Sequence, residues 1–154
     1  MRIILILTSL RTTLLLAKPA LADAIEIKLY QGLGEQNRVG KLFLRGGVEL
    51  DFEDSRFGGV SAMQIERGGR TAYLMTSQGH LAEVTLEYNT AGNLSGAQLA
   101  GIRDIIGAGG RGISSAIEAV ARIPDGGWLV AFERKHRLMH FTRSVKPLQT
   151  VPRL

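Results

Sequence analysis

The chain has 154 residues and no cysteine, and its 19 lysine and arginine residues exceed its 14 aspartate and glutamate residues, giving a formal net charge of +5. This length is enough for one domain with a modest hydrophobic core. The lack of cysteine excludes disulfide bonds, thiol catalysis and cysteine-ligated metal sites.

The first residues have the pattern of an export signal. A positive Met1-Arg2 start is followed by apolar runs over residues 3–10 and 14–17 and by the small-x-small sequence Ala20-Leu21-Ala22. We therefore predict a signal peptide over residues 1–22 and an exported mature domain, periplasmic or secreted, over residues 23–154. No stable membrane span is expected after signal removal. The alternative is a buried strand followed by a loop, since Arg11 and Lys18 interrupt the apolar region.

Removal of this segment changes the charge of the chain. It carries Arg2, Arg11 and Lys18, so 16 basic residues (19 − 3) face 14 acidic ones and the net charge becomes +2. So small an excess argues against a nucleic-acid-binding role. The basic residues that remain are concentrated after residue 100, where they could attract an anionic ligand or form solvated turns.

Short apolar runs and glycine-containing turns predict antiparallel β-structure up to residue 106. Strands are expected over residues 25–30, 41–45, 48–52, from 61 to the turn Arg67-Gly68-Gly69, 72–75, 81–86 and 97–106, with a loop over 88–96.

Residues 118–141 repeat this pattern as a three-stranded meander. A strand leads into Pro124-Asp125-Gly126-Gly127, residues 128–132 form a compact apolar strand, and a charged turn precedes a strand over 138–141. Trp128, Phe132 and Phe141 are expected in the core. Superposing Gly68-Gly69 on Gly126-Gly127 gives a shift of 58 residues. A repeated sheet unit at such a period indicates an all-β, β-propeller-like fold, whose open blade edges predict self-association.

Residues 107–112 support a competing interpretation, because GAGGRG matches the G-x-G-x-x-G pattern of a dinucleotide-binding unit. This alternative predicts a helix over residues 113–123 and a parallel sheet. Glycine is abundant in the chain, with 19 residues, and Arg103 and Asp104 stand where a buried parallel strand should be apolar. Both observations favour the propeller.

Four motifs in order resemble the phytase-like domain, the exported "esterase-like activity of phytase" family of bacterial β-propellers. They are residues 57–62 (FGGVSA), 76–79 (TSQG), 115–119 (SAIEA) and 130–137 (VAFERKHR), and residues 45–50 (RGGVEL) resemble the family's leading segment. The resemblance spans residues 41–152. It implies an exported propeller with ester or phosphoester hydrolase activity. Members of the family are usually longer, so the chain resembles the first half of a propeller and an incomplete ring is expected.

The chain departs from the family pattern at two acidic positions. Ser77 and Gln78 stand where the pattern has aspartate and arginine, and Ala116-Ile117-Glu118 keeps only the glutamate of an Asp-x-Glu-like motif. Two carboxylates that would support cation and phosphate chemistry are therefore missing. The second hypothesis, a non-catalytic binding or scaffold propeller of the cell envelope, follows from this loss.

Glu118 and Glu133 are the predicted catalytic pair, because both lie at strand edges and paired carboxylates can act as acid and base or bind Ca²⁺. Glu118 is the candidate metal ligand, although two carboxylates supply few of the oxygens that Ca²⁺ takes. Ion pairs with neighbouring arginines are the structural alternative. The predicted substrate-binding residues for a small anionic or ester substrate are Arg134, Arg137, Ser77 and His80.

Overall fold

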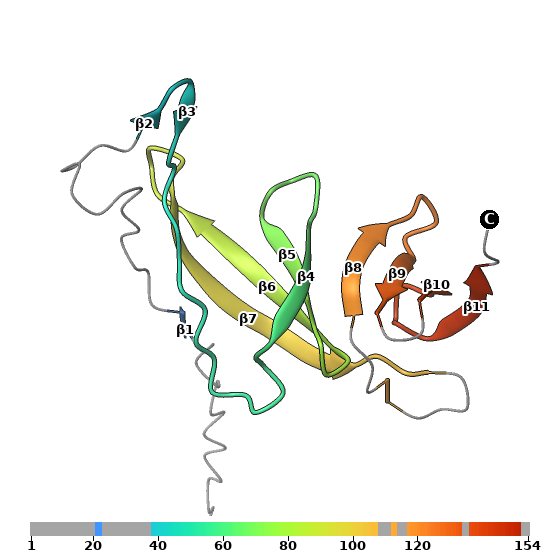
Figure 1. Cartoon of the computed structure of the whole chain (residues 1–154). Coiled ribbons are helices and arrows are strands. Elements are labelled where there is room, and N and C mark those ends of the chain that lie inside the picture. Colours follow the sequence, from blue (N-terminus) through green and yellow to red (C-terminus); the bar gives the residue numbers. More distant parts are fainter. Residues whose placement is uncertain (1–20, 23–37, 108–111, 114–116, 134–135, 152–154) are drawn as a thin grey trace, which may run out of the picture.

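The computed structural model describes residues 21–22, 38–107, 112–113, 117–133 and 136–151, and in this part of the chain all regular structure is β-strand. Two antiparallel sheets lie side by side (Figure 1). The predicted all-β, propeller-like class is confirmed, with two blade-like sheets that do not close into a ring within the described residues. The described residues include no helix that could span a membrane.

The first sheet has the strand order β1-β7-β6-β5-β4. Its four main strands form a meander that we call blade 1: β4 (Val60–Ile65), β5 (Thr71–Thr76), β6 (His80–Tyr88) and β7 (Leu94–Asp104). β1 (Leu21–Ala22) adds a short pairing to the outer side of β7. A separate two-stranded hairpin, β2 (Arg38–Val39) with β3 (Leu42–Phe43), precedes the blade. The predicted strand over 41–45 is thus shorter than expected, and that over 25–30 lies outside the described residues.

The second sheet, blade 2, has the order β11-β10-β9-β8. Its strands are β8 (Ile117–Arg122), β9 (Trp128–Phe132), β10 (Arg137–Phe141) and β11 (Pro147–Val151). β9 has the predicted bounds, and β11 was not predicted. Residues 117–122 pair antiparallel with β9, so the alternative of a helix over 113–123 in a parallel sheet is wrong. The alternating apolar side chains of this segment suit a strand with one face in the core.

The two blades are equivalent, strand for strand. β4 runs from Val60 to Ile65 and β8 from Ile117 to Arg122, a shift of 57 residues at both ends. Each strand carries a bulge at its start, at Ser61 in blade 1 and at Glu118 in blade 2. The turn glycines with positive φ are Gly69 and Gly126, a conformation that glycine adopts without strain. The repeat is therefore confirmed, and the predicted shift of 58 is one residue too long.

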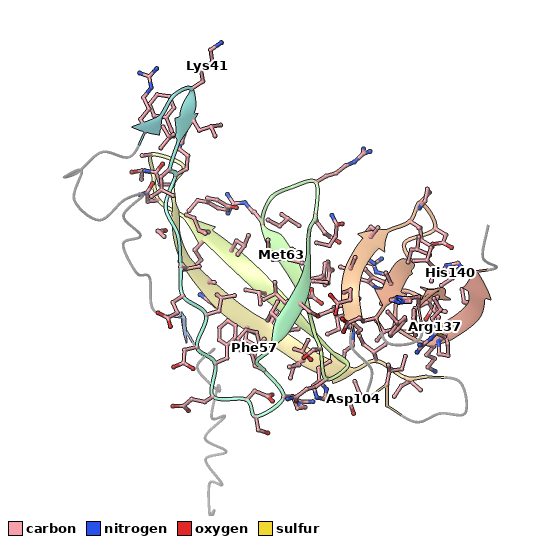
Figure 2. The ribbon with its side chains drawn as sticks, in the orientation of Figure 1. Lys41, Phe57, Met63, Asp104, Arg137 and His140 are labelled. Carbon is pink, nitrogen blue, oxygen red and sulfur yellow. The ribbon has the colours of Figure 1, made fainter. Side chains whose placement is uncertain are left out.

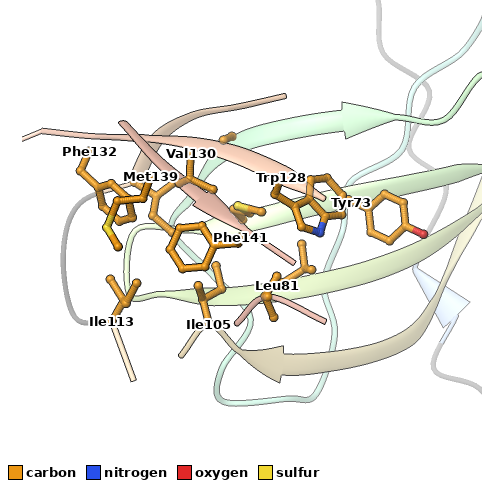
Figure 3. Close-up of a cluster of buried hydrophobic side chains, with 13 residues drawn as sticks. Tyr73, Leu81, Ile105, Ile113, Trp128, Val130, Phe132, Met139 and Phe141 are labelled. Carbon is orange, nitrogen blue, oxygen red and sulfur yellow. The ribbon is translucent and has the colours of Figure 1, made fainter. Parts of the chain in front are cut away.

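Each blade has two faces because side chains alternate along a strand. The front face of blade 1 carries Ala62, Tyr73, Met75 and Leu81, and it packs against the back face of blade 2, which carries Trp128, Val130, Phe132 and Phe141. Figure 3 shows this shared core. Trp128 meets Tyr73 edge-to-face with ring centroids 4.9 Å apart, and Phe132 and Phe141 are buried, as predicted.

Arg122 closes one end of this core. Its guanidinium lies 3.8 Å from the centroid of the Trp128 ring and 4.8 Å from that of Tyr73. It also donates to the carbonyl of Gly126 at 2.6 Å and to Glu66 Oε1, on the blade 1 hairpin, at 3.1 Å. A cation stacked on aromatic rings and paired with a carboxylate ties the two hairpins together.

Residues 48–57 cover the back face of blade 1. Val48, Leu50, Phe52 and Phe57 pack against a second core cluster that contains Ala72, Leu74, Ala82 and Val84. Phe52 and Phe57 meet edge-to-face at 4.7 Å. The predicted strand over residues 48–52 is wrong, because this segment pairs with no strand and contributes side chains instead. The predicted loop over 88–96 also ends early, since β7 begins at Leu94.

Candidate functional site

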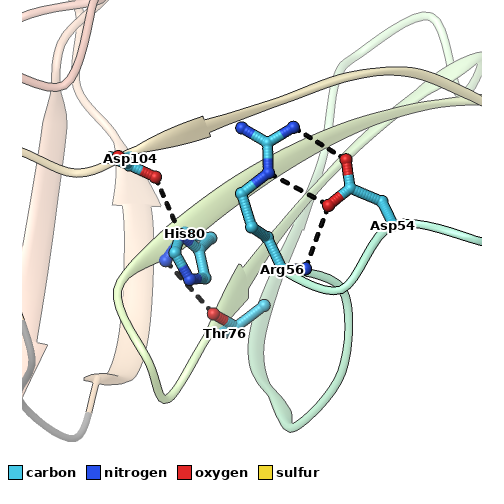
Figure 4. Close-up of polar contacts among 5 residues, drawn as sticks. All are labelled: Asp54, Arg56, Thr76, His80 and Asp104. Atoms are coloured by element: carbon cyan, nitrogen blue, oxygen red, sulfur yellow. Dashed lines mark hydrogen bonds and ion pairs between the residues drawn. The ribbon is translucent and has the colours of Figure 1, made fainter.

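A polar cluster lies where the β5–β6 turn meets the end of β7 (Figure 4). The turn closes when the Gly79 amide donates to the Thr76 carbonyl at 3.0 Å. Gly79 has a φ of +92° and leaves no space for a side chain, because a Cβ there would collide with the Ile113 carbonyl. The Ile105 amide donates to the Gly79 carbonyl at 2.9 Å and fixes the turn against β7. The turn is therefore a rigid support for His80, which follows it.

His80 is held through both its backbone and its ring. Its amide donates to Oγ1 of the buried Thr76 at 3.1 Å, and its Nδ1 lies 3.0 Å from Asp104 Oδ1. The His80 side chain is 20% exposed and that of Asp104 is 55% exposed. A carboxylate can only accept, so the ring nitrogen facing it carries the proton and Nε2 is left with a lone pair.

Two bulges in the β6–β7 ladder bring Asp104 opposite His80. Tyr88 pairs with Leu94 beside the turn, and a regular ladder from that pair would place Ile102 opposite His80. The register shifts once between Glu87 and Tyr88 and again between Glu83 and Val84, so that Asp104 becomes the partner. Bulges re-aim side chains in this way, and here they replace an apolar partner of the imidazole with a carboxylate.

Asp54 and Arg56 form the second half of the cluster. Asp54 Oδ1 accepts from the Arg56 amide at 2.9 Å and from Arg56 Nε at 3.0 Å, and Oδ2 accepts from Nη2 at 2.7 Å. These charge-assisted bonds, the side-chain bonds first, lower the pKa of Asp54 from 3.8 to about 2. The same carboxylate raises the pKa of Arg56. Arg56 is thus a cation held in place by Asp54. Its Nε and Nη2 bond to the carboxylate, and its Nη1 does not.

The two halves of the cluster interact electrostatically. The charge of His80 contributes to the lowered pKa of Asp54, and the charge of Asp104 contributes to the raised pKa of Arg56. We call Asp54, Arg56, Thr76, His80 and Asp104 the blade 1 polar cluster. It combines an oriented imidazole, whose Nε2 is not the atom that faces Asp104, with a guanidinium in electrostatic interaction with that carboxylate. Such a pair can take a proton from water or an alcohol beside a bound anionic group.

The predicted residues of blade 2 occupy positions equivalent to those of blade 1. Counted through the paired strands, Glu118 corresponds to Ser61, Glu133 to Ser77 and Arg137 to His80. Glu118 is exposed on the β8 bulge and Glu133 is exposed in the turn after β9. No contact brings either carboxylate into the blade 1 polar cluster, so Glu118 and Glu133 as a catalytic pair stays a prediction.

The predicted substrate-binding residues divide between the two blades. In blade 1, Ser77 is exposed in the turn beside His80, and its amide donates to the Gly59 carbonyl at 2.9 Å. In blade 2, Arg137 places its guanidinium 4.3 Å from the centroid of the Phe132 ring. Arg134 lies outside the described residues. The structure therefore gives His80 a partner that the sequence did not reveal, and it places Arg137 on an aromatic ring.

The described residues do not assemble a metal-binding group of three or more histidine, aspartate or glutamate side chains. Ca²⁺ takes about 6–8 oxygen ligands. The two carboxylates Glu118 and Glu133 do not match that requirement by themselves, and Glu118 as a metal ligand stays a prediction.

Asp54→Asn is expected to lower the melting temperature near neutral pH, because it removes the negative charge and leaves one amide oxygen in place of the two carboxylate oxygens that accept three bonds from Arg56. The folded-state pKa of Asp54 is depressed, so its contribution to stability is complete above the ordinary value of 3.8 and is lost as pH falls through about 2. The difference in melting temperature between wild type and variant should therefore vanish at the acid end. Asp51→Asn, at an exposed nearby carboxylate, is the control. A pH-independent difference would contradict the assignment.

The blade 1 polar cluster lies largely within a match to a known protein family. Residues 55–153 match the family model described as Phytase-like, esterase-like activity of phytase. The match covers more than half of the chain and contains both blades and Arg56, His80 and Asp104, whereas the leading segment 45–50 lies outside it. No curated protein and no solved structure gives a significant match to the chain.

Proposed function

The chain belongs to the Phytase-like family, esterase-like activity of phytase, and from this premise we propose that it hydrolyses ester or phosphoester bonds. The observation that carries the proposal is the His80 ring held by Asp104 at 3.0 Å, with both groups in electrostatic interaction with the Asp54–Arg56 pair. A general base, a group that orients it and a cation for an anionic substrate are the parts that hydrolysis at such a site needs.

The proposed step uses water as the nucleophile. His80 Nε2 accepts a proton from water as the water oxygen bonds to the ester carbon or phosphorus. The protonated ring then gives that proton to the departing alkoxide when its bond to carbon or phosphorus breaks. Asp104 keeps the imidazole in one tautomer and orientation and stabilises its positive charge. Arg56 offers Nη1 to a carboxylate or phosphate oxygen of the substrate, since arginine forks suit both anions.

Ser77 and the blade 2 residues have supporting parts in the proposal. Ser77, exposed at the rim of the turn, offers a hydroxyl to bound substrate. In the alternative version of the proposal, Glu118 and Glu133, at the equivalent end of blade 2, are the catalytic acid and base. Arg134 and Arg137 would then hold the anionic group.

The second proposed function is a non-catalytic binding module for an anionic ligand. It is favoured by a groove between the β4–β5 and β8–β9 hairpins, lined by Glu66, Arg67, Arg122 and Arg143 among others. Arg122 is committed to Glu66 and Gly126, whereas Arg67 and Arg143 are exposed at the rim. The excess of guanidinium groups suits a phosphate or carboxylate.

Export is proposed from the pattern of residues 1–22, with a periplasmic or secreted mature chain. Cleavage after Ala22 would remove β1 and leave β7 as the outer strand of its sheet. Determining the N-terminal sequence of the chain recovered from an export-competent bacterial host tests whether it is cleaved after Ala22.

Hydrolysis is tested with the purified wild-type chain and two chromogenic substrates, a nitrophenyl carboxylate ester and a nitrophenyl phosphate, with and without added Ca²⁺. We expect turnover of at least one of them. Loss of turnover in folded Glu118→Gln or Glu133→Gln would move the chemistry to blade 2. A folded wild-type chain that turns over neither substrate would contradict the hydrolase proposal and leave the binding module.

A further inference from the structure

The contact between the two blades is made mainly by their first strands. Within the described residues, the backbone of β8 lies against β4 and also approaches β5, while side chains of β9 such as Trp128 reach across to Tyr73. The front face of blade 1 and the back face of blade 2 meet there and share one hydrophobic core. Successive blades of this chain therefore pack with the front face of one against the back face of the next.

The front face of blade 2 repeats the apolar pattern of the front face of blade 1, but none of the described residues covers it. Through the paired strands, Ala62, Tyr73, Met75 and Leu81 correspond to Ala119, Leu129, Ala131 and Leu138. All four residues of blade 1 are buried. Their counterparts are exposed or half-buried, and Leu138 is 41% exposed where Leu81 is 1% exposed. Blade 2 thus exposes an apolar sheet face, whereas the equivalent face of blade 1 is buried.

The back of β4 is the matching half of the same contact, and in the part of the chain that the structure describes its apolar side chains are likewise exposed. Val60, Met63 and Ile65 correspond to Ile117, Val120 and Arg122, the residues through which β8 packs on blade 1. Val60 is 43% exposed, Met63 59% and Ile65 41%, and an apolar groove lined in part by Leu50, Phe57 and Leu74 runs beside them. Figure 2 shows Met63 on β4, which is an edge strand of its sheet. Residues 48–57 pack against β5, β6 and β7 and leave these three side chains of β4 exposed.

We propose that a second copy of this chain packs its β4 strand, through Val60, Met63 and Ile65, onto the front face of blade 2. The contact between chains then continues the contact that β8 makes with β4 inside one chain. Exposed apolar faces of this kind mark interaction sites, and here the chain itself contains both complementary halves. Because the two halves are different surfaces, the association is head-to-tail, and it closes into a ring only if the rotation between copies permits.

The experiment measures the molar mass of the full chain by sedimentation velocity over a range of concentrations. Wild type is expected to exceed the mass of one chain and to grow with concentration. Leu138→Glu on the front face and Met63→Glu on the back face should each give single chains at every concentration, since each variant lacks one half of the contact. An equimolar mixture of the two should form pairs and nothing larger, because one intact front face and one intact back face remain.

Leu42→Glu is the matched control, at a leucine on β3 that is 76% exposed and belongs to neither face. Thermal unfolding establishes that each variant is folded, and the exposed positions of Met63 and Leu138 make folding the expected result. A wild-type chain that stays single at its highest soluble concentration overturns the proposal. Association that survives Met63→Glu but not Leu138→Glu also overturns it, because this result indicates a symmetric front-to-front pair.

Discussion

His80→Gln is expected to lower kcat for ester hydrolysis by about 10²–10⁴-fold, the usual contribution of a positioned general base. Glutamine keeps a polar side chain beside Asp104 but has no ring nitrogen that can take a proton from water. KM should change little, since the anionic group of the substrate is held by Arg56 rather than by the imidazole. Steady-state kinetics on the better of the two chromogenic esters measures both constants.

Two further variants decide whether the effect comes from this histidine and its orientation. Asp104→Asn can present an amide N–H to Nδ1 and so favour the wrong tautomer, and kcat should fall with KM and melting temperature almost unchanged. His140→Gln is the matched control, because His140 also faces a carboxylate, with Nε2 3.2 Å from Asp125 Oδ2. Equal losses of kcat in His140→Gln and His80→Gln would contradict the role of the blade 1 polar cluster.

Trp128→Ala is expected to lower the free energy of unfolding by about 3–5 kcal/mol, the range for truncating a buried aromatic residue. Trp128 is fully buried at the centre of the core that the two blades share. Its loss removes the edge-to-face contact with Tyr73 and the ring on which Arg122 lies at 3.8 Å. Denaturant unfolding followed by circular dichroism measures the change.

Conservative and exposed substitutions control this prediction. Trp128→Phe keeps an aromatic ring under Arg122 and should lose less stability than the alanine variant. Phe43→Ala removes an aromatic ring that is 58% exposed on the N-terminal hairpin and should change stability by less than about 0.5 kcal/mol. Equal unfolding midpoints for Trp128→Ala and wild type would contradict the central place given to this residue.

Much of the fold could be predicted from the sequence because its signals are local. The continuous apolar runs of β5 and β9 and the glycine turns before them define two hairpins without reference to the rest of the chain. The segment over residues 48–52 was predicted as a strand because its alternation resembles one. Its side chains instead fill the back of blade 1, and local pattern cannot distinguish these outcomes. β11 was missed because its short run begins with Pro147 and follows a polar turn.

The candidate site was predicted only in part. His80 and Ser77 were predicted as substrate-binding residues, but Asp104 lies 24 residues beyond His80 and was considered only as an argument against a parallel strand. A hairpin count from the turn at residues 89–93 would have placed Ile102 opposite His80, since no pattern in the sequence reveals the two bulges. Asp54 and Arg56 were not among the predicted site residues. The Asp-x-Arg spacing, which lets one side chain bond to the other and to its amide, was the available signal.

The core shared by the two blades also decides how the molecule melts. The front face of blade 1 and the largest side chains of blade 2 are buried in the same cluster, together with Ile105 and Ile113 from the segment that connects the blades. Neither sheet therefore has an interior of its own at this contact, and separating them exposes Trp128 and Phe141 together. Heat or denaturant should take both blades apart in one cooperative transition, so that the pair, and not the single blade, is the unit of folding.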